Sequence, residues 1–384
     1  MRVPGMARRG PVFQSRSGDV SVRVGLLVHA DARFALDDPE RVDRFTFRRL
    51  RPSLRGRISR RFEFFVNPDF GSGTFVLQDA FVDAIVSPAL RIRAGKTKTP
   101  FGMERLHSAS NLLFFNRAFP TSVAPNRAVG VQLLGDIAGG LISYDAGVMS
   151  SVPDGGSITA DNHDGLDRYG RLVARPFRTA AATSPGRRLG VAFSGSEGRP
   201  SRAESLPVFQ TRTLQRPFFS YSDAIADGVR IRYSPQAFYF YKAFGGWGEY
   251  VHTTTPIRHG QVRKEIGHDA WQVAGSWVLS GEEATDEAGG IDPRRPFRLR
   301  GGGLGAWQVA ARFHALAVDR EARSFGFVRP ESSLDARSWT VGLNWILTRH
   351  VHATVHVERT VFDGNREGAR RPETVLALRT QISY

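Results

Sequence analysis

The chain has 384 residues, a net charge of +16 at pH 7 and no cysteine, so disulfide bonds and thiolate metal sites are excluded. No run of about 18 apolar residues occurs, so no transmembrane helix is expected. Only four of the 53 basic residues are lysines. Arginine therefore carries the excess charge, and its planar group suits anionic partners such as nucleic acid, anionic lipid or small anions.

Residues 1–18 contain Arg, Gly and Pro and lack the apolar stretch of a secretory signal. We predict a poorly ordered N-terminal segment here. The first regular pattern follows in residues 19–34, where Val22, Val24 and Val28 alternate with polar residues such as Arg23 and His29. Successive side chains of a strand point to opposite sides. The pattern therefore predicts a strand with one apolar and one polar, charged face.

The next candidate strand, residues 44–57, contains the pair Arg48 and Arg49. The apolar alternation changes phase across this pair, from Phe45 and Phe47 to Leu50. A phase change inside a strand indicates a β-bulge, which adds one residue to one strand of a pair. We predict a bulge that turns both arginines toward the interior.

Similar alternation, bounded by turn residues, gives seventeen candidate strands and no convincing helix. Single-chain bacterial barrels have an even number of strands, so we expect 16, with 18 as the alternative. The region 196–243 has the weakest pattern. The candidates are residues 19–34, 44–57, 60–67, 74–86, 90–98, 127–135, 141–149, 168–177, 187–195, 228–234, 236–243, 247–257, 268–279, 304–317, 338–348, 351–362 and 374–384.

The last candidate, residues 374–384, alternates without a break and ends on Tyr384. About 9–11 residues suffice for a tilted strand to cross a bilayer. A final strand that ends on an aromatic resembles the C-terminal signal of bacterial outer-membrane barrels. An edge strand of a soluble sandwich would show the same period. Long strands with ionisable residues on the second face favour a lipid-facing wall around a wet lumen.

Short turns contrast with long loops along the chain. Residues 348–350 are a short turn, whereas five connections are long. This asymmetry is typical of a transmembrane antiparallel up-and-down β-barrel, so we predict one such barrel over residues 19–384. The long loops are residues 99–126, 150–167, 196–227, 280–303 and 318–337.

Several segments, spread over nearly the whole chain from about Val20, share the order and spacing of motifs in a known family. They are FTFRRLRPSLRG (45–56), LQDAF (77–81), AGKTKTPFGMERL (94–106), SASNLLFFNRAFP (108–120), NRAVGVQLLG (126–135), DGVRIRY (227–233), GGWGEYV (245–251), AWQVAGSWVLSGE (270–282), GAWQVAARFHALAVD (305–319), TVGLNW (340–345) and RTQISY (379–384). Together they resemble the phosphate-selective porins of the O/P type from Gram-negative outer membranes.

This resemblance implies a 16-stranded, trimeric, water-filled barrel that passes anions. It also implies a long third loop, here residues 99–126, that folds inward and constricts the pore. Arginines and lysines would line the path, and an inward aspartate would face the constriction. The chain departs from the best-studied members in one respect, because its four lysines cannot form their lysine cluster on the periplasmic side.

The loop 99–126 holds the candidate anion-binding residues. In a constriction, guanidinium and ammonium groups replace the lost hydration of an anion, and serine hydroxyls add hydrogen bonds. The alternative is a surface loop whose cations face solvent or lipopolysaccharide. The candidates are Lys96 and Lys98 on the preceding strand, and Arg105, Ser108, Ser110 and Arg117 in the loop.

Asp79, in the LQDAF segment, is the candidate inward acid. It could hold neighbouring arginines in place and keep an anion from binding too tightly, since conduction requires that the anion leaves again. The alternative is a salt bridge in the lumen that only organises the wall.

Further arginines on candidate strands suggest a track of weak sites that passes an anion along. For each of them the alternative is an interfacial position against lipid phosphates. The track would consist of Arg33, Arg48, Arg49, Arg51, Arg230 and Arg232.

No catalytic or metal-binding pattern occurs. His352 and His356 share one strand face but lie about 13 Å apart on an extended strand, too far to share a metal. We expect no enzyme activity, no cofactor and no nucleic-acid partner. Tryptophans such as Trp271, Trp277 and Trp339 suit an aromatic girdle.

We therefore predict an outer-membrane porin for passive diffusion of anions, favouring phosphate or polyphosphate, through an arginine-lined constriction. It would form a homotrimer and contact outer-membrane lipid and lipopolysaccharide. No export signal is visible in the chain, so we expect its start to be misassigned. The alternatives are a non-selective anion porin and a structural barrel with a plugged lumen.

Overall fold

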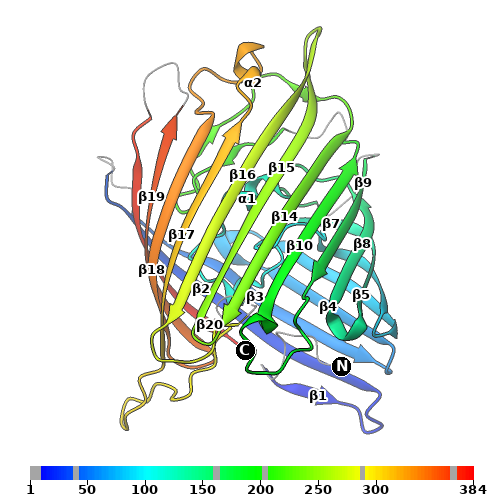
Figure 1. The fold of residues 1–384 in the computed structure, drawn as a ribbon, viewed down its shortest axis with the longest axis vertical. Helices are drawn as coiled ribbons and strands as arrows, with labels where there is room; N and C mark the ends of the chain where they lie inside the picture. Colours follow the sequence, from blue (N-terminus) through cyan, green and yellow to red (C-terminus); the bar gives the residue numbers. More distant parts are fainter. Residues whose placement is uncertain (1–9, 38–42, 159–164, 201–205, 286–289, 364–369) are drawn as a thin grey trace.

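The computed structural model describes residues 10–37, 43–158, 165–200, 206–285, 290–363 and 370–384. Within these residues, sixteen antiparallel strands form a closed barrel (Figure 1). The predicted all-β barrel of 16 strands is thus confirmed. The strands are β2 (Val20–Ala35), β3 (Arg44–Ile58), β4 (Phe62–Asp69), β5 (Val76–Ser87), β6 (Leu90–Lys98), β7 (Arg127–Ile137), β8 (Ile142–Ser150), β9 (Leu166–Ala174), β10 (Leu189–Gly198), β14 (Arg230–Tyr241), β15 (Phe244–His259), β16 (Val262–Val278), β17 (Ala306–Val318), β18 (Asp335–Ile346), β19 (Val351–Asp363) and β20 (Glu373–Ser383).

The barrel closes where the first long strand meets the last. β2 pairs with β20 in a continuous antiparallel register that includes Val28 opposite Ile382 and Phe34 opposite Leu376. β20 pairs with β19 on its other side. The alternating C-terminal strand is therefore the seam of the barrel and leaves neither β2 nor β20 as a free edge.

One division between strands predicted from the sequence is wrong, and the candidate 268–279 begins too late, since β16 runs from Val262 to Val278. The candidate strands 228–234 and 236–243 are a single strand, β14, whose burial alternates along its whole length. Pro235 lies in its middle, opposite Phe193 of β10, while the pairing with β15 skips from Tyr233 to Gln236. Proline lacks the N–H that a central ladder needs, so it interrupts one ladder without ending the strand. Merging the two candidates reduces seventeen strands to sixteen.

Four short strands lie outside the barrel count. β1 (Val12–Gln14) pairs with β2, so part of the predicted N-terminal segment 1–18 is hydrogen-bonded; residues 1–9 lie outside the described residues. β13 (Ile225–Ala226) pairs with β15, and β11 (Phe209–Gln210) with β12 (Pro217–Phe219) forms a separate hairpin.

The helical elements are short. α1 (Pro120–Val123) and α2 (Glu321–Ser324) have four residues each. The 3-10 turns are η1 (Gly71–Gly73), η2 (Ala109–Asn111), η3 (Ala138–Gly140) and η4 (Pro185–Arg188). No helix in the described part of the chain is long and apolar enough to cross a membrane.

The two faces of the wall differ in chemistry. On β14, Ile231 and Tyr233 are exposed on the outside, whereas Arg230 and Arg232 are buried inside. Trp271, Trp277 and Trp339 also lie exposed on the outer surface. An apolar outer band with aromatic residues and a polar interior is the arrangement of a barrel that spans lipid.

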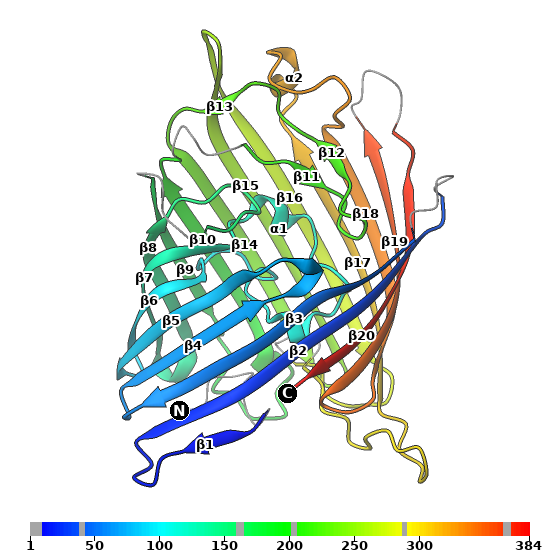
Figure 2. The same ribbon diagram turned by 180° about the vertical axis from the view of Figure 1, so that it is seen from behind.

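The two ends of the barrel also differ. Both described chain ends lie at the same end as short connections such as residues 59–61, 242–243 and 347–350 (Figure 2). The opposite end carries most of the longer connections, including residues 99–126 and 319–334, whereas residues 279–305 are a long connection at the end with the termini. Short turns face the periplasm in this class of barrel, so we assign the end with the termini to the periplasm.

Candidate functional site: an arginine-lined cavity beside the third loop

Residues 99–126, which connect β6 and β7, lie inside the barrel against the wall that runs from β15 to β20. The Met103 N–H donates to Glu249 Oε1 at 2.6 Å, and Arg379 Nη1 donates to the Phe115 carbonyl at 2.6 Å. Further bonds join the loop to Arg312, Asn344, His356 and Gln381. These contacts attach the loop to one side of the lumen.

Apolar packing reinforces this attachment. Phe101 and Phe119 of the loop are fully buried in one cluster with Val251, Ile266 and Leu316 of the wall. Burial of an aromatic side chain contributes about 1.5–3 kcal/mol. The loop is therefore held by packing as well as by hydrogen bonds, on one side of the lumen.

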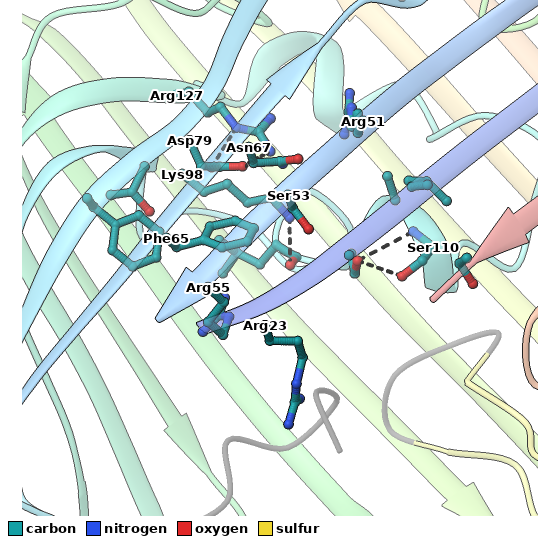
Figure 3. A pocket seen from close by; sticks show the side chains of 18 of the residues that line it. Arg23, Arg51, Ser53, Arg55, Phe65, Asn67, Asp79, Lys98, Ser110 and Arg127 are labelled. Carbon is teal, nitrogen blue, oxygen red and sulfur yellow. Dashed lines mark hydrogen bonds and ion pairs between the residues drawn. The ribbon is translucent and has the colours of Figure 1, made fainter. Parts of the chain in front are cut away.

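A cavity of about 440 Å³ lies on the opposite side, between the loop and strands β2–β8 (Figure 3). Seven of the lining residues are cationic and two are acidic. Such an excess of one charge in a cleft raises the local concentration of the opposite ion. The cations are Arg23, Arg51, Arg55, Arg91, Arg93, Arg127 and Lys98, and the acids are Asp79 and Asp145.

Carboxylates hold several of these arginines. Arg127 Nε donates to Asp79 Oδ1 at 2.9 Å, and Asn67 Nδ2 donates to Asp79 Oδ2 at the same distance. Arg51 Nε donates to Asp69 Oδ2 at 2.7 Å. Paired guanidinium groups are fixed in direction, because the planar fork matches the carboxylate.

Asp83 holds the next two arginines along β6. Its Oδ1 accepts from Arg93 Nε at 2.7 Å and its Oδ2 accepts from Arg91 Nη1 at 2.9 Å. Arg93 also lies over the Phe81 ring, 4.0 Å from its centroid. The aromatic face and the carboxylate together orient this side chain toward the cavity.

Two of the lining cations have no ion pair within the described residues. Arg55 lies over the Phe65 ring, 4.4 Å from its centroid. Lys98 Nζ donates to the carbonyls of Leu106 and His107 at 2.9 and 2.8 Å, which ties the strand to the loop. Because its partner is an aromatic ring and not a carboxylate, Arg55 keeps its positive charge available to a visiting anion.

The predicted site residues fall into two groups. Lys98, Ser108, Ser110, Asp79 and Arg51 line the cavity. The two serine hydroxyls are hydrogen-bonded to each other at 2.9 Å. Figure 3 shows Asp79, Asn67 and Arg127 together on one side of the cavity and Arg23 and Arg55 on the other. The structure thus brings together predicted residues from β3, β5, β6 and the loop 99–126.

The remaining loop candidates face the loop itself. Arg105 Nη2 donates to the carbonyl of Thr121, and Arg117 donates to the carbonyls of Glu104 and His107 at 3.0 and 2.6 Å. Lys96 is buried in β6 and does not line the cavity. Arg105 and Arg117 therefore brace the inward conformation of the loop, and their contact with an anion stays a prediction.

Burial and neighbouring charge act on the loop's titratable groups. Burial, followed by the charges of Arg117 and Lys98, lowers the pKa of His107 to about 3. Burial also lowers the pKa of Arg117 to about 9 against the opposing effect of Glu104, and Arg127 and Arg51 add to the decrease. Cations from the barrel wall and from the loop thus lie close together around His107 and Arg117.

The residues of the predicted arginine track lie in two separate places, on β2 and β3 and on β14. The predicted bulge is confirmed, because His29 pairs with Arg49 and Ala30 pairs with Phe47, which leaves Arg48 as the extra residue. Arg49 is buried with its Nη1 2.9 Å from His29 Nδ1. Arg33 is buried 3.5 Å from Asp31.

Arg230 and Arg232 lie elsewhere, on β14, and hold the connection between β8 and β9. Arg232 Nε donates to Asp154 Oδ1 at 2.8 Å, and Arg230 Nη2 donates to the Val152 carbonyl at 2.8 Å. Burial alone would raise the pKa of Asp154, but Arg232, His268 and Arg230 together outweigh burial and lower the pKa to about 2. Neither arginine lines the cavity.

Sequence reasoning missed two parts of the lumen. Arg55, Arg91 and Arg93 line the cavity but were not assigned to the passage; the alternation in the segment LRIR (90–93) was the available signal.

The second part is the hairpin β11–β12, which carries Arg212 into the lumen. Arg212 donates to the Arg117 carbonyl and to Ser122 Oγ, each at 2.7 Å.

Comparison with solved structures gives outer-membrane channels at low identity. The outer membrane channel DcaP of Acinetobacter baumannii matches with a TM-score of 0.61 and 10% identity, covering 98% of this chain and 100% of that chain. The trimer form of OmpT from Vibrio cholerae matches with a TM-score of 0.56 and 11% identity, covering 95% and 99%. OmpF of Salmonella typhi in complex with daunomycin matches with a TM-score of 0.58 and 8% identity, covering 97% and 100%. These matches show a shared fold.

No curated protein matches the chain at a significant level. The model of one family, phosphate-selective porin O and P, matches residues 22–384. This match spans the whole barrel, including the inward loop and the cavity wall. The chain therefore belongs to the phosphate-selective porin O and P family and is an outer-membrane porin.

Proposed function

We propose that this porin passes small anions by passive diffusion, with phosphate or polyphosphate favoured, through the cavity between the loop 99–126 and strands β2–β8. The observation that carries the proposal is the excess of seven cations over two acids on the cavity lining. Arginine and lysine on a pore wall are the usual basis of anion selectivity. Passage requires no chemical reaction and no coupled energy source.

The preference for phosphate follows from the kind of donors available. A guanidinium group offers paired N–H donors that fit two phosphate oxygens. Arg55 is free of ion pairs in the described part of the chain, and Ser108 and Ser110 add hydroxyls at the same cavity. A phosphate ion between them would exchange water contacts for charge-assisted hydrogen bonds.

One acid of the cavity limits how tightly an anion binds. Asp79 neutralises Arg127 and at the same time repels an approaching anion. Asp145 lies on the same wall. Because conduction needs binding that is weak enough for exit, we infer that the Asp79 carboxylate keeps the passage from becoming a trap.

Arg105 and Arg117 contribute by holding the loop in place and by adding positive charge beside the cavity. Their guanidinium groups donate to loop carbonyls, so the shape of the passage depends on them. The arginines of the β3 bulge, Arg48 and Arg49, extend the positive region next to this loop. The track would thus lead an anion along β3 toward Arg51 and Arg55.

A homotrimer is the assembly that we propose. OmpT of Vibrio cholerae, which shares the fold, is described in a trimer form. Exposed apolar side chains such as Phe45 and Phe47 cover the outside of β3. Lipid, lipopolysaccharide or a second subunit would cover this surface.

A plugged structural barrel is the second candidate, and one observation favours it. The loop 99–126 and the hairpin β11–β12 pack against each other inside the lumen, with Phe119 and Phe218 rings 5.9 Å apart. If these segments close the remaining path, no current would flow. A porin without phosphate preference is the third candidate.

The test is the single-channel conductance of the purified protein in a planar bilayer in chloride, with phosphate added stepwise. Chloride current that is blocked by low phosphate supports an anion passage with a phosphate site. Current that is indifferent to phosphate removes the substrate preference and leaves a general anion porin. Absence of current supports the plugged barrel.

A further inference from the structure

One connection at the periplasmic end differs from the others in length and composition. Residues 279–305 join β16 to β17, and their described part, residues 290–305, projects beyond the barrel on the side of the chain ends (Figure 1). The turn 242–243 on the same side has two residues. We call the described second part of this connection, residues 290–305, the arginine loop.

The arginine loop is anchored to the barrel rim by backbone bonds. The Phe297 N–H donates to the Leu347 carbonyl at 2.7 Å, and the Gly305 N–H donates to the Arg295 carbonyl at 3.0 Å. The Arg298 N–H donates to the Gly303 carbonyl at 3.1 Å, around a turn in which Gly302 has a φ of 76°. The loop therefore presents its tip in a defined direction.

Aromatic residues place the base of this loop at the membrane interface. The rings of Trp307 and Trp345 are stacked 5.0 Å apart, and Phe297 meets Trp345 edge-on at 5.3 Å. Trp345 Nε1 donates to the Leu304 carbonyl at 2.8 Å. Tryptophans at strand ends lie at the level of the lipid headgroups, so the arginine loop begins at that level.

The tip combines exposed cations with exposed leucines. Four arginines are exposed and have no ion pair within the described residues. Leu299, between two of them, is 90% exposed, and Leu304 is 69% exposed. The nearby Asp292 is already paired with Arg349 at 3.0 Å. The four arginines are Arg294, Arg295, Arg298 and Arg300.

We propose that the arginine loop binds the headgroups of anionic phospholipids in the periplasmic leaflet. The guanidinium groups would pair with headgroup phosphates, and Leu304, which lies beside Trp345 at the base of the loop, would lie against the boundary between headgroups and acyl chains. Two observations support this inference. The charge of the exposed arginines is opposite to that of the headgroup phosphates, and Trp307 and Trp345 place the base of the loop at the headgroup level. It is independent of anion passage through the lumen.

The experiment measures the preference of the loop for an anionic over a zwitterionic lipid. The porin is reconstituted in bilayers that contain brominated phosphatidylglycerol or brominated phosphatidylcholine, which quench the fluorescence of nearby Trp307 and Trp345. We expect phosphatidylglycerol to bind more tightly, and the variant R294Q/R295Q/R298Q/R300Q to lose at least about fivefold of this preference. The double variant R298Q/R300Q, altered only at the exposed tip, should lose part of it.

The matched control makes the same change in charge at the opposite rim. It carries Arg263→Gln, Arg320→Gln, Arg329→Gln and Arg337→Gln, at four exposed arginines. Unchanged conductance and heat-dependent gel mobility verify the barrel in every variant. The proposal fails if the unaltered porin shows no lipid preference, or if both fourfold variants lose the preference equally. Loop-dependent binding to isolated peptidoglycan sacculi, without lipid preference, would also overturn it.

Discussion

The Arg127 guanidinium makes two hydrogen bonds to the Asp79 carboxylate, Nε to Oδ1 at 2.9 Å and Nη2 to Oδ2 at 3.2 Å, on the wall of the arginine-lined cavity. The two residues come from β7 and β5 and are 48 positions apart in the sequence. This pair neutralises one of the seven cations of the cavity. A substitution of Asp79 is therefore the most direct way to change the net charge of the passage.

Replacing Asp79 by asparagine should make phosphate bind more tightly in the pore. The variant removes a negative charge and leaves Arg127 unpaired, so we expect half-block of the chloride current at a phosphate concentration about tenfold lower, since about 1.4 kcal/mol corresponds to a factor of ten. Phosphate titration of single channels measures this. Asp136→Asn, at the exposed end of β7, is the control. A half-block concentration equal to that of the unaltered porin would show that Asp79 only organises the wall.

Replacing Arg55 by glutamine should have the opposite effect. Arg55 has no ion pair in the described part of the chain, so its loss removes a full charge from the passage. We expect the phosphate concentration for half-block to rise about three- to tenfold, by the same scale of about 1.4 kcal/mol per factor of ten. The reversal potential in a salt gradient should shift toward lower anion selectivity. Arg60→Gln, in the exposed turn between β3 and β4, changes the same charge outside the cavity and should leave both values unchanged.

The fold followed from the sequence because alternation is a local signal. Each strand of the barrel needs only a period of two, and β20 shows this period in residues 374–384. The bulge at Arg48 was visible for the same reason, since it shifts the phase within one strand. Pro235 misled the assignment of β14, because the loss of one N–H resembles the end of a strand in the sequence.

The site was only partly predictable because its ion pairs cross between hairpins. Alternation indicates that Arg91 and Arg93 share a face, but their pairing with Asp83 depends on the register of β5 against β6. The positions of Arg105 and Arg117 depend on how the loop folds back on itself. No periodic pattern in the sequence predicts the path of the loop 99–126. None predicts that the hairpin β11–β12 places Arg212 in the lumen.

Replacing Arg105 by alanine should loosen the inward loop. The variant loses the donor to the Thr121 carbonyl, and an unsatisfied buried carbonyl costs about 1–3 kcal/mol. We expect noisier open-channel current and weaker phosphate block together. Single-channel recordings of R105A and of the conservative R105K test this. Weaker block with unchanged current noise would instead show that the Arg105 side chain contacts the anion directly.

Replacing Asp154 by asparagine should lower the stability of the barrel in a pH-dependent way. Arg232, together with His268 and Arg230, lowers the pKa of Asp154 to about 2, below the value of about 3.9 for an unfolded aspartate. The ionised form is thus favoured in the folded state, and its stabilisation is present above about pH 4 and is lost as the pH falls toward 2. The size of the shift corresponds to about 2–3 kcal/mol above pH 4.

Urea unfolding of the unaltered porin and of D154N, followed by tryptophan fluorescence from pH 7 to pH 2, measures the difference. We expect a constant difference between pH 7 and pH 5 that shrinks below pH 4, because protonation of Asp154 then weakens its pair with Arg232 in the unaltered protein as well. Asp292→Asn is the matched control, since Asp292 forms an exposed ion pair with Arg349 that should contribute less than about 1 kcal/mol. A difference that stays constant down to pH 2 would show that the charge of Asp154 does not stabilise the fold and that its hydrogen bonds alone do.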